Sequence, residues 1–309
     1  MKLLITGGTG LVGSAIQKIK NNYNYDFVFI SSKDCDLSNF NKTNELFFKE
    51  KPDYVIHLAA YVGGLYKNIK YKVDMLEINL MINYNVLKCC NIHNVKKVIS
   101  CLSTCVFPDK TEYPIDETNL HNGPPHNSNY AYSYAKRLLE IQSRTYQQQY
   151  NKNFICIIPT NIYGPNDNFS LENGHCIPSL VHKCYLAKKN NTPFIVLGSG
   201  TPLRQFIYSE DLAELTMWVL EHYNNNEPII LSVCEDDEIS IKDVALNIAR
   251  IFNYNKIEFN TNYVDGQFKK TATNKKLLEL YKNYNFTKIE YGLKETINWF
   301  VDNFDICRK

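Results

Sequence analysis

The chain has 309 residues, of which 44% are hydrophobic, and its formal net charge at pH 7 is +2. This length supports one large domain or two lobes with a shared cleft. The near-neutral charge gives no electrostatic reason to expect nucleic acid or a membrane surface as the partner. The ten cysteines lack zinc-ligand spacing, which favours reduced thiols and no metal site. No cleavable signal pattern follows Met1 and no apolar run approaches the roughly 20 residues that span a bilayer, so we expect a cytoplasmic protein.

A glycine-rich turn separates the first predicted strand, residues 2–6, from helical spacing that begins near residue 15. Its glycines stand three residues apart, which is a variant of the dinucleotide-binding fingerprint. Glycine lets the backbone approach a pyrophosphate, which the N-terminus of the following helix attracts. A simple glycine turn is the alternative, but the position between strand and helix favours a cofactor site. The expected contacts are Gly7, Gly8, Thr9, Gly10, Leu11, Val12 and Gly13.

The second predicted strand, residues 26–30, ends in a segment that indicates which dinucleotide is bound. An NAD-selective site carries a carboxylate here, whereas this chain has Ser32 and Lys33, which suit a 2′-phosphate. We therefore predict a preference for NADPH. Asp36 and Leu37 follow soon afterwards and are candidates for contact with the adenine, although a plain loop aspartate is nearly as good an interpretation.

A third apolar strand at residues 54–58 runs into Ala59 and Ala60, whose small side chains leave room for a cofactor at the strand's carboxyl end. His57 lies inside this strand, where a core histidine is favoured over a catalyst. A helical segment follows at 74–93, and a fourth strand is predicted at 97–102. This alternation predicts an α/β fold with a doubly wound parallel sheet.

The fourth strand delivers Ser103 and Cys105 to the same carboxyl edge. Ser103 has the hydroxyl needed to hold a substrate oxygen, with a strand-end turn as the alternative. A thiolate at Cys105 would abstract a proton from a carbon beside a carbonyl, whereas a small buried hydrophobe is the commoner fate of a free cysteine. Composition alone does not decide between these interpretations of Cys105.

Tyr132 and Lys136 stand four residues apart and therefore share one face of a predicted helix. The ammonium is expected to lower the pKa of the phenol, so that the hydroxyl exchanges a proton at a carbonyl or alcohol carbon. The chain holds 22 tyrosines, so this spacing taken alone is as well explained by chance. The preceding dinucleotide fingerprint and Ser103 make the pair informative.

The fingerprint TGGTGLVG, together with seven other segments, resembles the extended short-chain dehydrogenase/reductases and, among them, the GDP-L-fucose synthase family. The segments extend over nearly the whole chain: HLAAYVGG, SCLSTCVFPDK, NYAYSYAKR, IPTNIYGPNDNF, LENGHCIPSL, GSGTPLRQFIYSEDLAEL and VDGQFKKTATN. The resemblance implies an NADP(H)-dependent enzyme that epimerises C3 and C5 of GDP-4-keto-6-deoxy-D-mannose and then reduces C4. It also implies a homodimer formed through helices at about 74–93 and 130–149.

Residue by residue, the resemblance implies a role for five side chains. Tyr132 would protonate the C4 oxygen, Lys136 would hold the nicotinamide ribose, and Ser103 would orient the ketone. Cys105 matches the epimerisation base and His175 the acid on the opposite face, although a loop histidine is the plain alternative for His175. Further cofactor contacts would come from Pro159, Thr160, Asn161, Ile162 and His175, with an asparagine that caps the loop as the alternative for Asn161.

The second lobe is expected to bind the nucleotide sugar through Lys183, Arg204 and Asp265, the two cations facing the diphosphate. Leu197 stands where relatives often carry tryptophan, which affects a stacking contact. The expected division is a cofactor domain at 1–165 and about 206–234, and a substrate domain at about 166–205 and 235–309. Two rival functions remain at this point: a nucleotide-sugar 4-epimerase or 4-reductase that spares C3 and C5, and a non-catalytic NADP sensor, which the presence of both Tyr132 and Lys136 disfavours.

Overall fold

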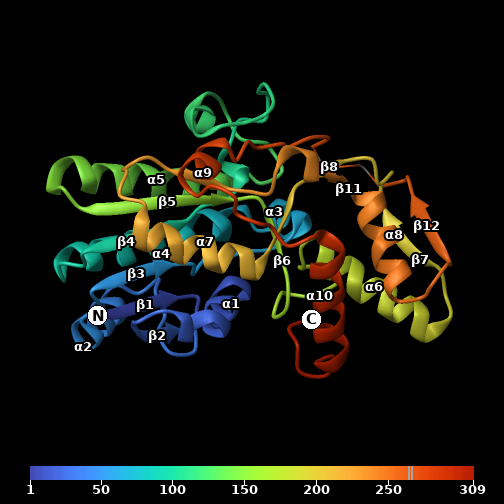
Figure 1. Ribbon diagram of the computed structural model, residues 1–309, viewed down its shortest axis with the longest axis horizontal. Coiled ribbons are helices and arrows are strands. Elements are labelled where there is room, and N and C mark those ends of the chain that lie inside the picture. Colours follow the sequence, from blue (N-terminus) through green and yellow to red (C-terminus); the bar gives the residue numbers. More distant parts are fainter. Residues whose placement is uncertain (264, 266) are drawn as a thin grey trace.

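The computed structural model describes residues 1–263, 265 and 267–309. Its centre is a six-stranded sheet in the order β10-β5-β4-β3-β1-β2, in which every pairing is parallel (Figure 1). The strands are short and nearly all buried, as expected for a parallel sheet covered on both faces. They are β1 Lys2–Thr6, β2 Asp26–Ile30, β3 Tyr54–His57, β4 Lys97–Cys101, β5 Asn153–Pro159 and β10 Ile229–Leu231.

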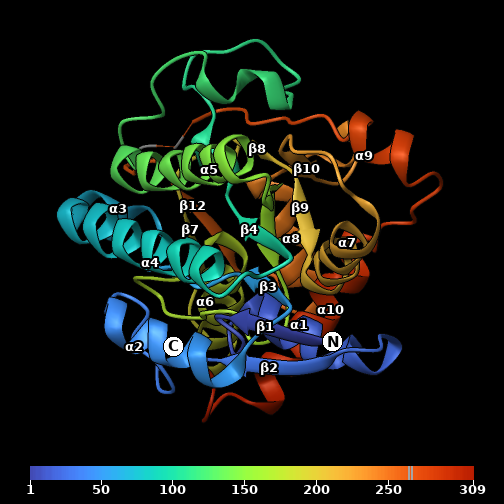
Figure 2. The same cartoon turned by 90° about the vertical axis from the view of Figure 1, so that its left-hand side faces the viewer.

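Helices cover both faces of this sheet, which confirms the predicted doubly wound α/β fold (Figure 2). One face carries α2 Phe40–Glu50, α4 Lys72–Ile92 and α5 Tyr130–Tyr150, with α3 Leu65–Lys70 directly before α4. The other carries α1 Leu11–Ile19 and α7 Ser209–His222. Short 3₁₀ helices complete this part: η1 Lys20–Asn22, η2 Thr104–Val106, η3 Glu117–His121 and η4 Glu235–Asp237.

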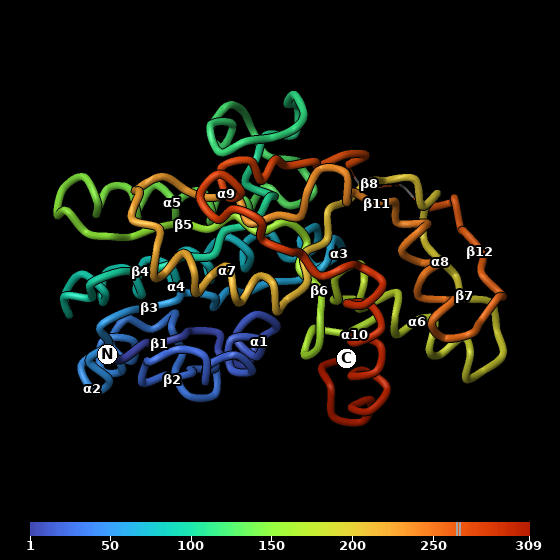
Figure 3. Tube along the Cα trace, viewed as in Figure 1, coloured from blue at the N-terminus to red at the C-terminus, as the bar shows by residue number. Residues whose placement is uncertain are grey.

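A second lobe lies beyond the carboxyl edge of the sheet, to the right in Figure 1, and the chain crosses to it more than once, as the tube in Figure 3 shows. Its helices surround a separate aromatic core that includes Phe169, Phe194 and Phe300. Its elements are α6 Cys176–Asn190, α8 Ile241–Ile251 and α10 Ile289–Asp302, with the parallel pair β7 Phe194–Leu197 and β12 Ile257–Asn260. Two small pairs join the lobes: β6 Asn161–Tyr163 with β9 Phe206–Tyr208, and β8 Leu203–Arg204 with β11 Ile239–Ser240.

One segment expected in the second lobe packs on the first. Helix α9, Lys275–Leu280, lies against β10, and Leu277, Tyr281 and Phe286 join the hydrophobic core under α1 and α7. The two-part division at 1–165 with 206–234 and 166–205 with 235–309 stays a prediction, and this packing places residues 275–286 with the cofactor lobe. Within the described part of the chain, no helix combines the length and apolarity needed to cross a membrane.

The strand order reverses between β1 and β3, and this reversal positions the site. In open parallel sheets, ligands bind outside the carboxyl ends of the strands at such a switch point. The glycine-rich turn after β1 and the segment after β3 lie there, while β4 and β5 deliver their carboxyl ends to the same edge.

Candidate active site

The glycine-rich turn is packed so tightly that a side chain at Gly7 or Gly13 would not fit. Gly7 has φ +69°, a conformation that favours glycine, and a Cβ on it would lie 2.9 Å from the Ala59 nitrogen. A Cβ on Gly13 would lie 2.5 Å from the Gly7 oxygen. Helix α1 begins after Gly10 with no acidic residue in its first turn, so its N-terminal N–H groups are free to face an anion. The turn therefore fits a dinucleotide pyrophosphate.

A buried hydrogen-bond chain connects this turn with the helix that carries Tyr132. The Ala59 N–H donates to Thr6 Oγ1 at 3.3 Å, and Thr6 Oγ1 lies 2.8 Å from His57 Nδ1. His57 Nε2 lies 3.1 Å from Asn83 Oδ1, and Asn83 Nδ2 donates to the Ala135 carbonyl at 3.4 Å. His57 is fully buried, which confirms that it is a core residue. These hydrogen bonds connect β1, β3 and α4 to α5 at Ala135, the residue before Lys136.

The segment after β2 is exposed and arranged around Asp34. Asp34 accepts hydrogen bonds from the backbone N–H of Ser31 at 2.8 Å and from its hydroxyl at 2.6 Å, and these bonds lower the pKa of the carboxyl. Ser32 and Lys33 are exposed, and Lys33 forms no ion pair within the described residues. Asp36 accepts from Ser38 at 2.6 Å, whereas Leu37 is buried in the core. Lys33 therefore remains available for a phosphate.

The carboxyl end of β4 turns directly into η2, which carries Cys105. Ser103 caps this short helix, its hydroxyl oxygen accepting the Cys105 N–H at 3.4 Å. Cys105 is 8% exposed and joins a hydrophobic cluster against which Tyr132 packs. Ser103, Cys105 and Tyr132 are thus brought together at one end of the sheet.

Lys136 lies close to Tyr132 but makes its hydrogen bond elsewhere. Its Nζ donates to the Cys101 carbonyl at 2.7 Å and lies 5.8 Å from the centroid of the Tyr132 ring. Burial raises the pKa of Tyr132 well above its ordinary value, and Cys105 and Cys101 add to that rise. The lowered pKa expected from the spacing is therefore wrong for the protein alone, because burial is the largest influence on the phenol. Tyr132 is held as a protonated phenol, which is the form that a proton donor requires.

His175 stands at the beginning of α6, exposed, on a loop that is bonded to the segment after β3. The Gly64 N–H donates to the Asn173 carbonyl at 3.0 Å, which fixes this loop beside the switch point. Asp167 is buried nearby, and its Oδ2 has no hydrogen-bond partner in the described part. Burial raises the pKa of Asp167, and His175 opposes that rise. No described hydrogen bond joins His175 to Tyr132 or Cys105, so its part in catalysis stays a prediction.

Three cations gather where α6, β8 and the segment before α9 meet. Burial, and then the charge of Arg204, lower the pKa of Lys270, while burial lowers the pKa of Lys183. Arg204 donates to the carbonyls of Leu203 and Gln267, both at 2.6 Å. Lys183, Arg204 and Lys270 form no ion pair with a carboxylate of the described chain. Partly buried cations without carboxylate partners fit a polyanionic ligand such as a diphosphate.

The two remaining residues predicted to bind substrate lie at the end of β7. Leu197 is the last residue of that strand and is half-buried. Asp265 accepts hydrogen bonds from the Ser199 N–H at 3.0 Å and from the Ser199 hydroxyl at 2.6 Å. In the protein alone Asp265 therefore holds the turn after Leu197, and a substrate contact for either residue stays a prediction.

The end of β5 provides a further place for the cofactor. Pro159 is its last residue, and Thr160 follows with a buried hydroxyl that has no hydrogen-bond partner in the described part of the chain. Asn161 Nδ2 donates to the Gln205 carbonyl at 3.0 Å, and Ile162 packs on the core under α1 and α7. An unpaired buried hydroxyl costs free energy unless a ligand supplies a partner. Thr160 and the glycine turn thus both fit a bound dinucleotide.

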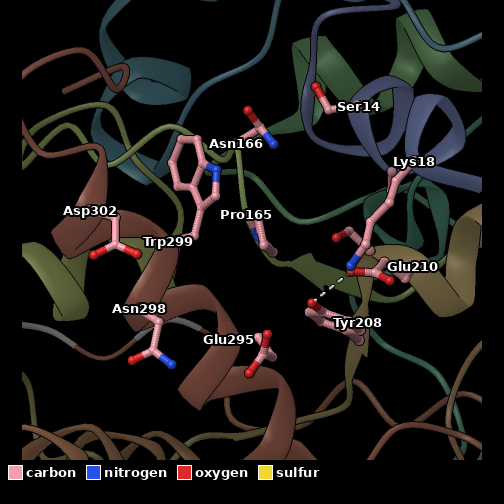
Figure 4. Close-up of a pocket in the computed structure, with 12 residues that line it drawn as sticks. Ser14, Lys18, Pro165, Asn166, Tyr208, Glu210, Glu295, Asn298, Trp299 and Asp302 are labelled. Carbon is pink, nitrogen blue, oxygen red and sulfur yellow. Dashed lines mark hydrogen bonds and ion pairs between the residues drawn. The ribbon is translucent and has the colours of Figure 1, made fainter.

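A separate hollow of about 380 Å³ lies between α1, α7 and α10. Figure 4 shows Lys18, Tyr208, Glu210 and Trp299 around it. Lys18 Nζ donates to Glu210 Oε1 at 2.6 Å. None of the predicted catalytic residues lines it. No group of His, Cys, Asp and Glu side chains that suits a metal ion occurs within the described chain.

Comparison with known proteins agrees with this geometry. Residues 3–234 match the NAD dependent epimerase/dehydratase family. The GDP-L-fucose synthase of Dictyostelium discoideum is 52% identical over 311 residues, which cover 99% of this chain and 97% of that protein. The chain belongs to the GDP-L-fucose synthase family.

Other members of the GDP-L-fucose synthase family support this assignment. The probable GDP-L-fucose synthase of Drosophila melanogaster is 48% identical over 100% of this chain and 99% of its own length. The crystal structure of a GDP-L-fucose synthetase from Naegleria fowleri bound to NADP superimposes with a TM-score of 0.95 at 49% identity, covering 99% of this chain and 94% of that one. The predicted resemblance is therefore confirmed.

The structure adds two site residues that sequence reasoning missed. Lys270 joins Arg204 at the cation cluster, and the two adjacent lysines at 269 and 270 were the only sequence signal for it. Asp167 faces His175 from the loop after β6, and nothing in the sequence distinguishes it from an ordinary loop aspartate. Lys270 is recognised by partial burial with no ion pair among the described residues, and Asp167 by burial with its Oδ2 unpaired there. Both signals are properties of the fold.

Proposed function

We propose that this protein is a bifunctional NADPH-dependent enzyme that converts GDP-4-keto-6-deoxy-D-mannose to GDP-L-fucose by epimerising C3 and C5 and then reducing C4. The observation that carries the proposal is the position of Cys105 beside Tyr132, Lys136 and Ser103 in a chain 52% identical to a GDP-L-fucose synthase. A reductase that acts only at C4 needs the tyrosine, lysine and serine, but it has no use for a thiol at this position.

Epimerisation requires a base, an acid and a stabilised oxygen. Cys105, as the thiolate, takes the hydrogen from C3 or C5, and the electrons of the broken C–H bond move toward the C4 oxygen. Hydrogen bonds from Tyr132 and Ser103 stabilise the negative charge on that oxygen. His175 then returns a proton to the same carbon from the opposite face, so the bond is remade with inverted configuration and the ketone is restored.

Reduction uses the same hydrogen bonds from Tyr132 and Ser103 to the C4 oxygen. NADPH, when bound, supplies a hydride to C4. Tyr132 gives its proton to the C4 oxygen, and the raised pKa of the free protein's phenol keeps that proton in place beforehand. Lys136 would hold the nicotinamide ribose and, with its charge, would stabilise the phenolate that remains.

The GDP part of the substrate is assigned to the cation cluster. Lys183, Arg204 and Lys270 converge without carboxylate partners in the described residues, and Arg204 offers a planar fork that suits phosphate oxygens. Asp265 is assigned a polar contact with the nucleoside. Leu197, which is aliphatic, offers packing there rather than aromatic stacking.

The proposal includes a homodimer formed through α4 and α5. These two helices pack side by side, and their outer faces expose Val73, Met81 and Tyr84 from α4 and Tyr134 and Leu138 from α5. Exposed apolar patches of this kind mark protein interfaces. Light scattering should give twice the chain mass, and Met81→Glu should shift the protein toward the monomer. A wild-type monomer at micromolar concentration would remove the dimer from the proposal.

The proposed reaction is tested by isotope incorporation. The enzyme is given GDP-4-keto-6-deoxy-D-mannose and NADPH in heavy water, and the product is analysed for deuterium at C3 and C5. Both positions should be labelled, whereas a pure 4-reductase would label neither. Cys105→Ser should lose the label at both carbons while it still binds NADPH, which shows that the variant is folded. Full labelling by Cys105→Ser would remove this residue from its role.

A further inference from the structure

Arg137, the residue after Lys136, is a buried cation next to Cys105 that the proposed reaction does not yet use. Its side chain is 6% exposed. Its Nε donates to the Val106 carbonyl at 2.6 Å, and Val106 is the last residue of η2, whose central residue is Cys105. The guanidinium is therefore bonded to the short turn that presents the thiol.

The charge of Arg137 has no compensating carboxylate. It takes part in no ion pair within the described residues, and its Nη2 is buried there without a hydrogen-bond partner. Burial lowers the pKa of Arg137, whereas Tyr134 and Cys105 oppose that effect. A guanidinium does not give up its proton in a protein, so a buried one without an anion is costly. This site therefore favours an anion within reach of Arg137.

We propose that Arg137 is a positioning residue for epimerisation, which stabilises Cys105 in its thiolate form and holds η2 in place. This inference rests on the function proposed above. In the resting enzyme the Cys105 thiol loses its proton to water, and the thiolate then accepts the hydrogen from C3 or C5. Arg137 exchanges no proton in this sequence.

Other charged or titratable groups also face Cys105 from the elements around it. On α5 these are Lys136, whose Nζ is committed to the Cys101 carbonyl, and Tyr132, whose pKa is raised by burial. On the segment before α9 the group is Lys270, whose pKa is lowered by burial and by the charge of Arg204 and raised by the carboxylate of Asp109. Arg137 differs from both cations because it is bonded directly to the η2 backbone.

The test measures how the reactivity of Cys105 depends on pH. The full-length protein is treated with iodoacetamide between pH 5 and 10, and mass spectrometry quantifies alkylation of the Cys105 peptide among the ten cysteines. Because only the thiolate reacts, the pH at which the alkylation rate of Cys105 is half its maximum reports the thiolate population. This pH is called the Cys105 midpoint. Arg137→Gln should raise this midpoint by about one pH unit or more, a tenfold loss of thiolate at a given pH. Arg137→Lys, which keeps the charge, should raise it less.

Arg144→Gln is the matched control, because Arg144 lies two turns further along α5 and pairs with Glu140 at 3.3 Å, and no hydrogen bond described for the chain joins it to η2. Its midpoint should equal that of the wild type. Deuterium exchange at C3 and C5 by Arg137→Gln should fall about tenfold at pH 7 and recover at higher pH. A role limited to folding would not produce this recovery.

Two results would overturn the inference. One is an Arg137→Gln protein that still binds NADPH and alkylates at Cys105 with the same pH midpoint as the wild type. The other is deuterium exchange at C3 and C5 by Arg137→Gln that falls at pH 7 and does not recover at higher pH, because lost thiolate is restored when the pH rises. Failure of the proposed function is distinguishable, since Cys105→Ser would then exchange C3 and C5 normally whatever Arg137 does.

Discussion

His57 should make the stability of this protein depend on acidity in a way that can be calculated. The imidazole is fully buried between Thr6 and Asn83. Since the Ala59 N–H donates to Thr6 Oγ1, the Thr6 hydroxyl is left to donate to Nδ1, which fixes the neutral ring with its proton on Nε2. Burial, and then the charge of Lys136, lower the pKa of His57 from 6.5 to about 3, with the Asn83 bond opposing.

The sign follows from this depressed pKa. Below pH 6.5 the unfolded chain binds a proton at His57 that the folded protein refuses, so the stabilisation is complete above pH 6.5 and is lost as the pH falls toward about 3. At pH 5.0 the difference from 6.5 is 1.5 units, which at about 1.36 kcal/mol per unit gives a loss of about 2 kcal/mol.

The assay is urea unfolding followed by tryptophan fluorescence at pH 7.5 and pH 5.0, for wild type and His57→Gln. Glutamine does not titrate, so the wild type should lose about 2 kcal/mol more than the variant between the two pH values. The comparison cancels His93 and His182, whose pKa values burial also lowers. Parallel losses in the two proteins would refute the reasoning. So would a greater loss in the variant.

Three further substitutions have expected outcomes. Gly13→Ala places a Cβ 2.5 Å from the Gly7 oxygen, and the displaced turn should weaken NADPH binding roughly tenfold or more in a fluorescence titration, whereas unchanged affinity would contradict the fit. Lys33→Glu should reduce the preference for NADPH over NADH about tenfold in kcat/KM, and an undiminished preference would remove Lys33 from the 2′-phosphate. Lys97 Nζ donates to the Val219, Leu220 and Tyr223 carbonyls at 2.9, 2.7 and 2.6 Å, which caps the C-terminal end of α7. Lys97→Met should therefore lower the free energy of unfolding in urea by about 2 kcal/mol without changing kcat. An undiminished stability would show that this cap is dispensable.

Much of the scaffold could be predicted because its signals are local. Apolar strands that alternate with helical spacing required a parallel sheet, and the glycines at 7 and 13 stand where a Cβ would strike backbone atoms. The four-residue spacing of Tyr132 and Lys136 places both on α5. Each of these inferences depends on a few neighbouring residues, and each is correct because contacts with distant segments leave the local conformation unchanged.

The rest depends on contacts between segments far apart in the chain. Lys136 bonds to the Cys101 carbonyl, and burial raises the pKa of Tyr132, so the simple pairing of phenol and ammonium was not sufficient. Arg137 and Lys270 look like ordinary surface cations in the sequence. Their importance lies in being partly or fully buried without a carboxylate partner among the described residues, which no spacing reveals.

The central claim is that one hydrogen-bonded C4 oxygen serves both the epimerisation and the reduction. Ser103→Ala tests it directly, because the change removes a donor to that oxygen and keeps the Cys105 thiol and the Tyr132 phenol. Alkylation of Cys105 by iodoacetamide is the control, since the Ser103 hydroxyl also accepts the Cys105 N–H. Deuterium exchange at C3 and C5 and NADPH oxidation should both fall, each by about 100-fold, in the same preparation. Exchange at the wild-type rate together with slowed NADPH oxidation would contradict the claim.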